Sequence, residues 1–197
     1  MNNSIAIITD IYGLTPAVIE WKKQLEQHYQ QVHVLSPYQQ FQFEQTALQD
    51  EQAIYQHFIS HCGHDAFKDK VKTLLSANDF DYIVAFSAGA SATWRVLAES
   101  TFSVKQFIGI YPSQIRNHLS ISPKCSTSLI FPISEPHFSV DDVIKTLSTK
   151  KQVTCIRTPW FHGFFNQYSS KFDAQAHQLL SAAILTGNNA LEPKKIN

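Results

Sequence analysis

The stretch Asp81-Tyr82-Ile83-Val84-Ala85-Phe86-Ser87-Ala88-Gly89-Ala90-Ser91-Ala92 decides the fold. Its apolar first half predicts a buried strand, and the tiny residues after Ser87 predict a helix that begins at once. A serine on so sharp a turn has a strained backbone, and its hydroxyl projects above the edge of the sheet. Ala85 and Gly89 are small, as required where strand and helix nearly touch. A plainer interpretation stays open from this stretch alone: Ser87 merely caps the helix.

Size and composition narrow the class of protein. The 197 residues suit one domain with a sizeable core, expected over 1–186, with a polar tail over 187–197. The 16 basic and 16 acidic residues balance, which gives no electrostatic reason to expect nucleic acid or an anionic membrane as partner. The three cysteines are odd in number and widely spaced, and no signal peptide or membrane span is visible. We therefore expect a cytoplasmic protein. The sequence does not indicate its oligomeric state.

Short apolar runs alternate with helical stretches along the whole chain. This alternation predicts an α/β-type, doubly wound, mainly parallel sheet of about six or seven strands with helices on both faces. In such a sheet ligands bind beyond the carboxyl ends of the strands. The expected strands are 4–9, 32–35, 82–86, 106–111, 128–133 and 152–157.

Three side chains that follow strands have the chemistry of a catalytic triad. The hydroxyl of Ser87 needs a base to take its proton, and His162 titrates near neutral pH. The histidine in turn needs a carboxylate, which Glu135 would supply. Asp141 and Asp142 are rejected as the acid because they begin a capped helix, where acidic residues have a structural reason to be. Taken alone, His162 is better explained as a half-buried structural histidine in an aromatic loop, but the matching order of serine, acid and histidine favours the catalytic interpretation.

These segments resemble the dienelactone hydrolase family of α/β hydrolases. Residues 9–14 (Thr-Asp-Ile-Tyr-Gly-Leu), 131–136 (Phe-Pro-Ile-Ser-Glu-Pro) and 162–166 (His-Gly-Phe-Phe-Asn) are similar to that family's early turn, acid loop and histidine loop. The resemblance implies the α/β-hydrolase fold and a serine hydrolase that cleaves a small ester, thioester or lactone through an acyl-serine intermediate, without a cofactor. The chain departs from the family's usual cysteine nucleophile and aspartate, with Ser87 and Glu135 in those places.

The same resemblance implies an oxyanion hole made by the backbone N–H groups of Ile11 and Ala88. Asp10, beside it, either orients the nucleophile or caps its own turn. Some members carry an arginine where this chain has Asn166, so dienelactone itself is not the expected substrate. The residues expected to bind a small-molecule substrate are Asp10, Tyr12, Trp160, Phe161 and Phe165.

The expected pocket has an apolar wall, because the loops that build it contain few basic residues. Arg157 and Arg116 are the basic residues in these loops, and neither is expected to reach the site. An anion without a partner carries a large desolvation cost, so we expect neutral, short acyl esters to be favoured over carboxylate-bearing ones.

Two further interpretations stay open. A non-catalytic binding module with the same fold is suggested by Ala85, where a glycine is usual, by Asn166 and by the short chain. A zinc site at His57, His61 and His64 is disfavoured, because a glycine breaks the helix before the third histidine. The chain has no G-x-G-x-x-G or Walker loop, so no nucleotide cofactor is expected. Because the zinc site is disfavoured, no metal is expected either.

Overall fold

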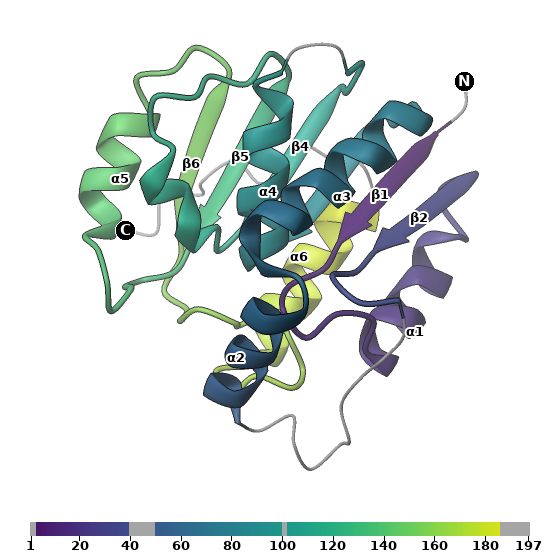
Figure 1. Cartoon of the computed structure of the whole chain (residues 1–197), viewed down its shortest axis with the longest axis horizontal. Helices are drawn as coiled ribbons and strands as arrows, with labels where there is room; N and C mark the ends of the chain where they lie inside the picture. Colours follow the sequence, from purple (N-terminus) through teal and green to yellow (C-terminus); the bar gives the residue numbers. More distant parts are fainter. Residues whose placement is uncertain (1–2, 40–49, 100–101, 186–197) are drawn as a thin grey trace.

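The computed structural model of the chain describes residues 3–39, 50–99 and 102–185. Within them six strands form one sheet of parallel neighbours, in the order β2-β1-β3-β4-β5-β6 (Figure 1). The chain passes from β1 to β2 on one side and then to β3 on the other, which places a ligand-binding switch point at the carboxyl ends of β1 and β3. The predicted doubly wound parallel sheet is confirmed. The strands are β1 (Ser4–Ile8), β2 (Gln31–Leu35), β3 (Tyr82–Phe86), β4 (Gln106–Ile110), β5 (Ser126–Phe131) and β6 (Val153–Arg157).

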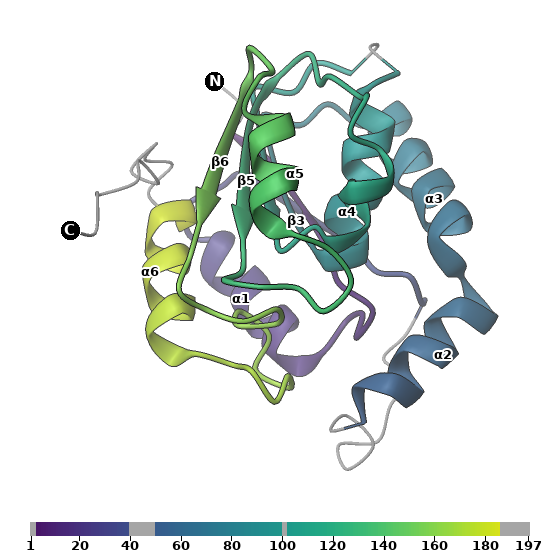
Figure 2. The same cartoon turned by 90° about the vertical axis from the view of Figure 1, so that its left-hand side faces the viewer.

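Helices cover both faces of this sheet. Figure 2 shows α1 and α6 on one face and α3, α4 and α5 on the other, and both views place α2 towards the carboxyl ends of the strands. Side-chain caps begin several of the helices, among them Thr15 at α1, Asp50 at α2 and Ser139 at α5. The helices are α1 (Pro16–Leu25), α2 (Glu51–His61), α3 (Gly63–Ala77), α4 (Ser87–Leu97), α5 (Val140–Leu147) and α6 (Ala174–Leu185), with a short 3₁₀ helix η2 (Ser113–Asn117) after β4.

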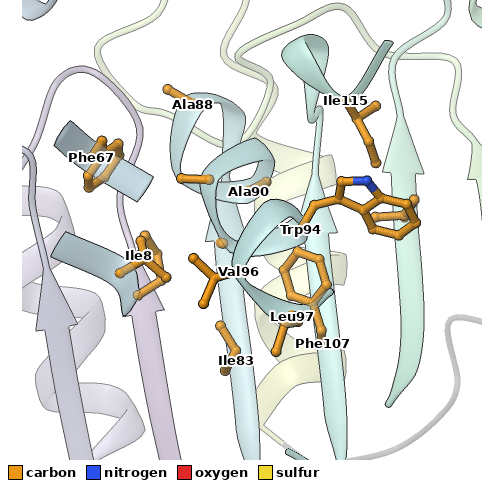
Figure 3. Close-up of a cluster of buried hydrophobic side chains, with 14 of the residues drawn as sticks. Ile8, Phe67, Ile83, Ala88, Ala90, Trp94, Val96, Leu97, Phe107 and Ile115 are labelled. Atoms are coloured by element: carbon orange, nitrogen blue, oxygen red, sulfur yellow. The ribbon is translucent and has the colours of Figure 1, made fainter. Parts of the chain in front are cut away.

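Each strand contributes alternate side chains to two hydrophobic cores, because successive residues of a strand point to opposite faces. In β3, Ile83 belongs to the core under α3, α4 and α5, whereas Val84 belongs to the core under α1 and α6. Figure 3 shows the first core, in which Trp94 of α4 lies beside Phe107 of β4. Both faces of the sheet are therefore dry, as expected for parallel strands.

The turn between β3 and α4 has the predicted geometry. Ser87 has a φ of 46°, in the left-handed region that non-glycine residues rarely adopt. A Cβ added to Gly89 would overlap the carbonyl oxygen of Thr9 and lie 3.0 Å from that of Ile8. The start of α4 therefore lies directly against the end of β1, which is possible only because residue 89 has no side chain.

Some boundaries differ from the expectation. The segment expected to be loop after β4 contains η2, and β5 covers 126–131 rather than 128–133. Pro132 ends β5 early because proline has no N–H to donate to the ladder. The expected polar tail, 187–197, lies outside the described residues. Among the helices of the described ranges, none has the length and apolar character needed to cross a membrane.

Candidate active site

Three side chains from three loops at the carboxyl edge of the sheet form a hydrogen-bonded chain. Ser87 follows β3, Glu135 lies in the loop after β5, and His162 lies in the loop after β6. The Ser87 Oγ lies 3.1 Å from His162 Nε2, and His162 Nδ1 lies 2.7 Å from Glu135 Oε1. With the Nδ1 proton donated to the carboxylate, Nε2 is free to accept the serine proton.

The surroundings fix the histidine and its acid. The side chain of Glu135 is 6% exposed and that of His162 is 25% exposed. The acid is therefore shielded from solvent, whereas the base remains partly exposed to the cavity. A backbone bridge between Glu135 and Phe138 closes the acid loop. Gly163 has a φ of 87°, and a Cβ there would overlap the side chain of Ser169. This glycine therefore allows the histidine loop to fold back on itself.

Asp10 is the centre of the turn after β1. Its Oδ1 accepts a hydrogen bond from the N–H of Tyr12 at 2.9 Å, and its Oδ2 accepts one from Asn166 Nδ2 at 2.8 Å. Asp10 therefore caps its own turn, and it also joins that turn to the histidine loop. Burial raises the pKa of the Asp10 carboxyl to about 6, against the opposing effects of these two hydrogen bonds and of the nearby His162.

Two residues beside Ser87 are those expected to supply the N–H groups of an oxyanion hole. Ile11 and Ala88 line the same cavity as Ser87. Tyr38 donates its hydroxyl to the carbonyl of Ile11 at 3.0 Å, which fixes the orientation of the turn. The N–H of Ala88 lies in the first turn of α4, where N–H groups have no partner within the helix.

A cavity of about 940 Å³ opens in front of Ser87 and contains most of the predicted site. Tyr12 is 4% exposed and forms part of its buried wall, whereas Phe161 is 54% exposed and stands at its mouth. The predicted site residues that line it are Asp10, Ile11, Tyr12, Ser87, Ala88, Glu135, Phe161 and His162.

The structure does not place Trp160 and Phe165 on this cavity, which corrects their expected role in binding substrate. The Trp160 ring packs 5.3 Å from that of Phe164. The Phe165 ring packs 5.2 Å from Trp21 and 4.9 Å from Phe86, and it borders a smaller, adjoining cavity of only about 40 Å³. Both aromatic side chains belong to the core under α1 and α6 because burial of their rings outweighs exposure beside a polar site.

The cavity wall is also more basic than expected. Arg116 of η2 and Lys171, in the segment that leads to α6, both line the cavity of Ser87. Arg157 does not line it and pairs with Asp141 at 2.6 Å instead. The expectation of a wall without a fixed cation is therefore wrong for Arg116, because η2 folds the supposed loop back over the start of α4.

Tyr111 was missed by the sequence interpretation although it directly follows β4. Its φ of 40° is the second left-handed value among the described non-glycine residues. Its ring centroid lies 4.8 Å from that of His162, and its buried hydroxyl has no hydrogen-bond partner in the described part of the chain. Its position after a strand, at the edge where ligands bind, is the signal that would have identified it.

The three histidines of the disfavoured zinc site do not face a common centre. The rings of His57 and His61 stack at 3.9 Å, whereas His64 packs edge-on against Phe58 at 5.1 Å. Across residues 3–39, 50–99 and 102–185 no group of three histidine, cysteine or acidic side chains is placed to hold a metal ion.

Comparison with solved structures defines the class of fold. A protein of the alpha/beta hydrolase superfamily from Xanthomonas campestris pv. campestris aligns over 94% of this chain and 98% of its own, with a TM-score of 0.61 and 11% identity. Est1E from Butyrivibrio proteoclasticus, in its ferulic acid-bound structure, aligns over 94% of this chain and 87% of its own, with a TM-score of 0.60 and 9% identity. A dienelactone hydrolase from Anabaena variabilis aligns over 94% of this chain and 84% of its own, with a TM-score of 0.59 and 10% identity. The chain has the α/β-hydrolase fold.

A sequence relative identifies the family. The uncharacterized protein YczH of Bacillus subtilis (strain 168) is 31% identical over 147 residues, which cover 71% of this chain and 70% of YczH. The chain belongs to the same family as YczH. No family model matches it. Membership of the dienelactone hydrolase family in particular stays a prediction.

Proposed function

We propose that this protein is a serine hydrolase that cleaves a small ester, thioester or lactone through an acyl-Ser87 intermediate. The observation that carries the proposal is the chain of hydrogen bonds from Ser87 through His162 to Glu135. Serine, base and carboxylate in this order are the working parts of serine hydrolases on several unrelated folds. The likeness to esterase and dienelactone hydrolase structures agrees with the proposal.

In the proposed reaction, Ser87 Oγ attacks the carbonyl carbon while its proton passes to His162 Nε2. The carbonyl electrons move to the oxygen, and the N–H groups of Ile11 and Ala88 stabilise that oxyanion. The intermediate then collapses: the bond to the leaving group breaks, and His162 returns the proton to the departing alcohol or thiol. Water repeats the sequence on the acyl-enzyme and releases the acid and Ser87.

The competing interpretation is a non-catalytic binding module. That interpretation expects a serine outside hydrogen-bond reach of the histidine, and the 3.1 Å separation argues against it. Ala85, in place of the usual glycine, is fully buried at the end of β3, and Ser87 after it still adopts the left-handed backbone of the turn. We therefore retain the hydrolase as the proposed function.

Labelling with a fluorophosphonate tests the proposal directly. The reagent reacts with activated serines, so mass spectrometry is expected to find the adduct on Ser87. A Ser87→Ala variant that keeps the wild-type circular dichroism spectrum is expected to take no label. An unlabelled wild-type protein that is demonstrably folded would exclude the acyl-serine mechanism.

A further inference from the structure

A polar side pocket adjoins the candidate active site. It has a volume of about 190 Å³ and lies between the start of α3, the first turns of α4, and η2. Three residues, His64, Ala88 and Gln114, line both this pocket and the larger cavity of Ser87, so the two spaces meet. Ala88 directly follows Ser87 in the chain. A group in the side pocket is therefore close enough to be part of a molecule whose carbonyl lies at Ser87.

Arg116 lines the larger cavity and acts electrostatically on His64, which lines both spaces. Its guanidinium is held in place by uncharged groups. One Nη1–H donates to the carbonyl of Ser113 at 2.7 Å, and the guanidinium carbon lies 5.3 Å from the centre of the Phe138 ring. In the described ranges no carboxylate pairs with it, whereas Arg95 and Arg157 each pair with an aspartate. A guanidinium has five N–H donors, so most of those of Arg116 remain for a ligand.

The side pocket is lined by Arg95, His64 and His118 and also by Asp65, which pairs with Arg95 at 2.7 Å. Burial, together with the charges of Arg95 and Arg116 and the neighbouring His118, lowers the pKa of His64, although Asp65 opposes this. The buried Nε2 of His64 has no hydrogen-bond partner in the described structure. The positive charge of Arg116 beside this unpaired nitrogen favours an anion as its partner.

Three carboxylates, those of Asp10, Glu51 and Glu135, also line the cavity. Glu51, at the start of α2, acts electrostatically on Asp10, Tyr12 and Tyr111, which belong to the β1 and β4 ends of the cavity. Arg116 acts on His64 instead. Glu51 and Arg116 thus act on different groups of the cavity, and Glu135 is already paired with His162.

We propose that the wall of the Ser87 cavity that contains Arg116 and His64 is an anion subsite, in which Arg116, assisted by His64, binds a carboxylate or phosphate group of the substrate. The inference rests on the proposed hydrolase function, and it narrows the substrate to an ester or thioester that carries an anionic group. Arg116 makes paired, charge-assisted hydrogen bonds to that group. Lys171, whose ammonium lies 5.7 Å from the centre of the Phe161 ring at the mouth, attracts anions towards the cavity.

A matched pair of esters tests the subsite. Mono-p-nitrophenyl glutarate carries a free carboxylate, and its methyl ester is the neutral counterpart with the same leaving group. The ratio of kcat/KM for the acid over the methyl ester is expected to be about tenfold or more in the wild type. In Arg116→Gln the ratio is expected to fall to near one. Lys145→Gln removes an exposed charge on α5 that lines neither space, so it is expected to keep the wild-type ratio.

The outcomes separate the subsite from the hydrolase proposal. Hydrolysis of both esters with a ratio near one in the wild type overturns the subsite and leaves the hydrolase standing. An Arg116→Gln variant that slows both esters equally assigns the arginine a purely structural role and also overturns it. If neither ester is cleaved and Ser87 takes no fluorophosphonate, the hydrolase proposal fails. Calorimetric titration with glutarate and with inorganic phosphate then decides the subsite: binding that Arg116→Gln abolishes supports it, and absence of binding overturns it.

Discussion

Glu135 holds His162 through one carboxylate oxygen, at 2.7 Å from Nδ1. In Glu135→Gln the amide NH₂ can donate to Nδ1, which favours the tautomer with its proton on Nε2, where it cannot accept from Ser87. We expect kcat for an active ester to fall by about 10³- to 10⁴-fold, as for the corresponding change in other serine hydrolases, with a smaller change in KM.

Steady-state kinetics of purified Glu135→Gln measures this loss, and Glu135→Asp is the matched control because it keeps the charge. The aspartate variant is expected to retain more activity than the glutamine variant. Equal activity in wild type and Glu135→Gln would show that the carboxylate has no part in catalysis.

The carboxyl of Asp10 makes a second residue-scale prediction, about stability and pH. Its pKa rises from an ordinary value of 3.8 to about 6 in the folded chain, chiefly through burial. The folded protein therefore holds this proton more tightly than the unfolded chain, and stability falls as pH rises from about 4 to about 6. A two-unit shift corresponds to at most about 3 kcal/mol, and less here because solvent still reaches the partly exposed carboxyl.

Urea unfolding of wild type and Asp10→Asn at pH 4, 5, 6 and 7 tests the shift. The free energy of unfolding of the wild type, relative to the variant, is expected to decline across this range. Titrating groups remote from Asp10 are present in both proteins and cancel in the difference. A difference that stays constant with pH would mean that Asp10 has an ordinary pKa.

At the scale of elements, the contact between β1 and α4 depends on Gly89. Alanine usually stabilises a helix relative to glycine by about 1 kcal/mol. At this position the added Cβ would overlap the carbonyl oxygen of Thr9, and backbone yields much less readily than a flexible side chain. We therefore expect Gly89→Ala to lower the free energy of unfolding by about 3 kcal/mol or more.

Gly63→Ala is the matched control for that variant. Gly63 has a φ of 71°, but no atom lies within 4 Å of an added Cβ, so only the conformational cost of about 1 kcal/mol is expected. Chemical denaturation of both variants separates the two causes. A Gly89→Ala protein as stable as the wild type would show that β1 and α4 separate without loss.

The elements were predictable wherever the local pattern was sufficient. Each strand is a short apolar run because both its faces are buried, and the small residues after Ser87 report a backbone contact that only a small residue permits. The 3₁₀ helix η2 was not predictable, since its five residues show no hydrophobic period. That omission hid Arg116, whose place on the cavity depends on how η2 folds back.

For the whole molecule, the order of the strands sets which residues meet. Ser87, Glu135 and His162 come from the ends of three parallel strands, so the sequence order and the α/β pattern together predict one common edge. The aromatic residues around His162 carry no such positional signal. Phe161 faces the cavity while Phe165 is buried beside Trp21, and only the packing of the complete loop distinguishes them.

The two cores share every strand of the sheet, and this predicts how the molecule unfolds. Trp21 lies in the core under α1 and α6, whereas Trp94 lies in the core under α3, α4 and α5. Loss of either core exposes one face of a sheet whose parallel strands are stable only when both faces are covered. We therefore expect both cores to be lost in one cooperative transition.

Tryptophan fluorescence reports the two cores separately. In a Trp160→Phe background, Trp94→Phe leaves Trp21 as the probe, and Trp21→Phe leaves Trp94. Within each variant, the urea midpoint from fluorescence is expected to coincide with the midpoint from far-UV circular dichroism, even though the two variants differ in stability. A fluorescence midpoint that precedes the loss of secondary structure in one variant alone would show that the core of its remaining tryptophan opens first, and the chain would then contain two unfolding units rather than one.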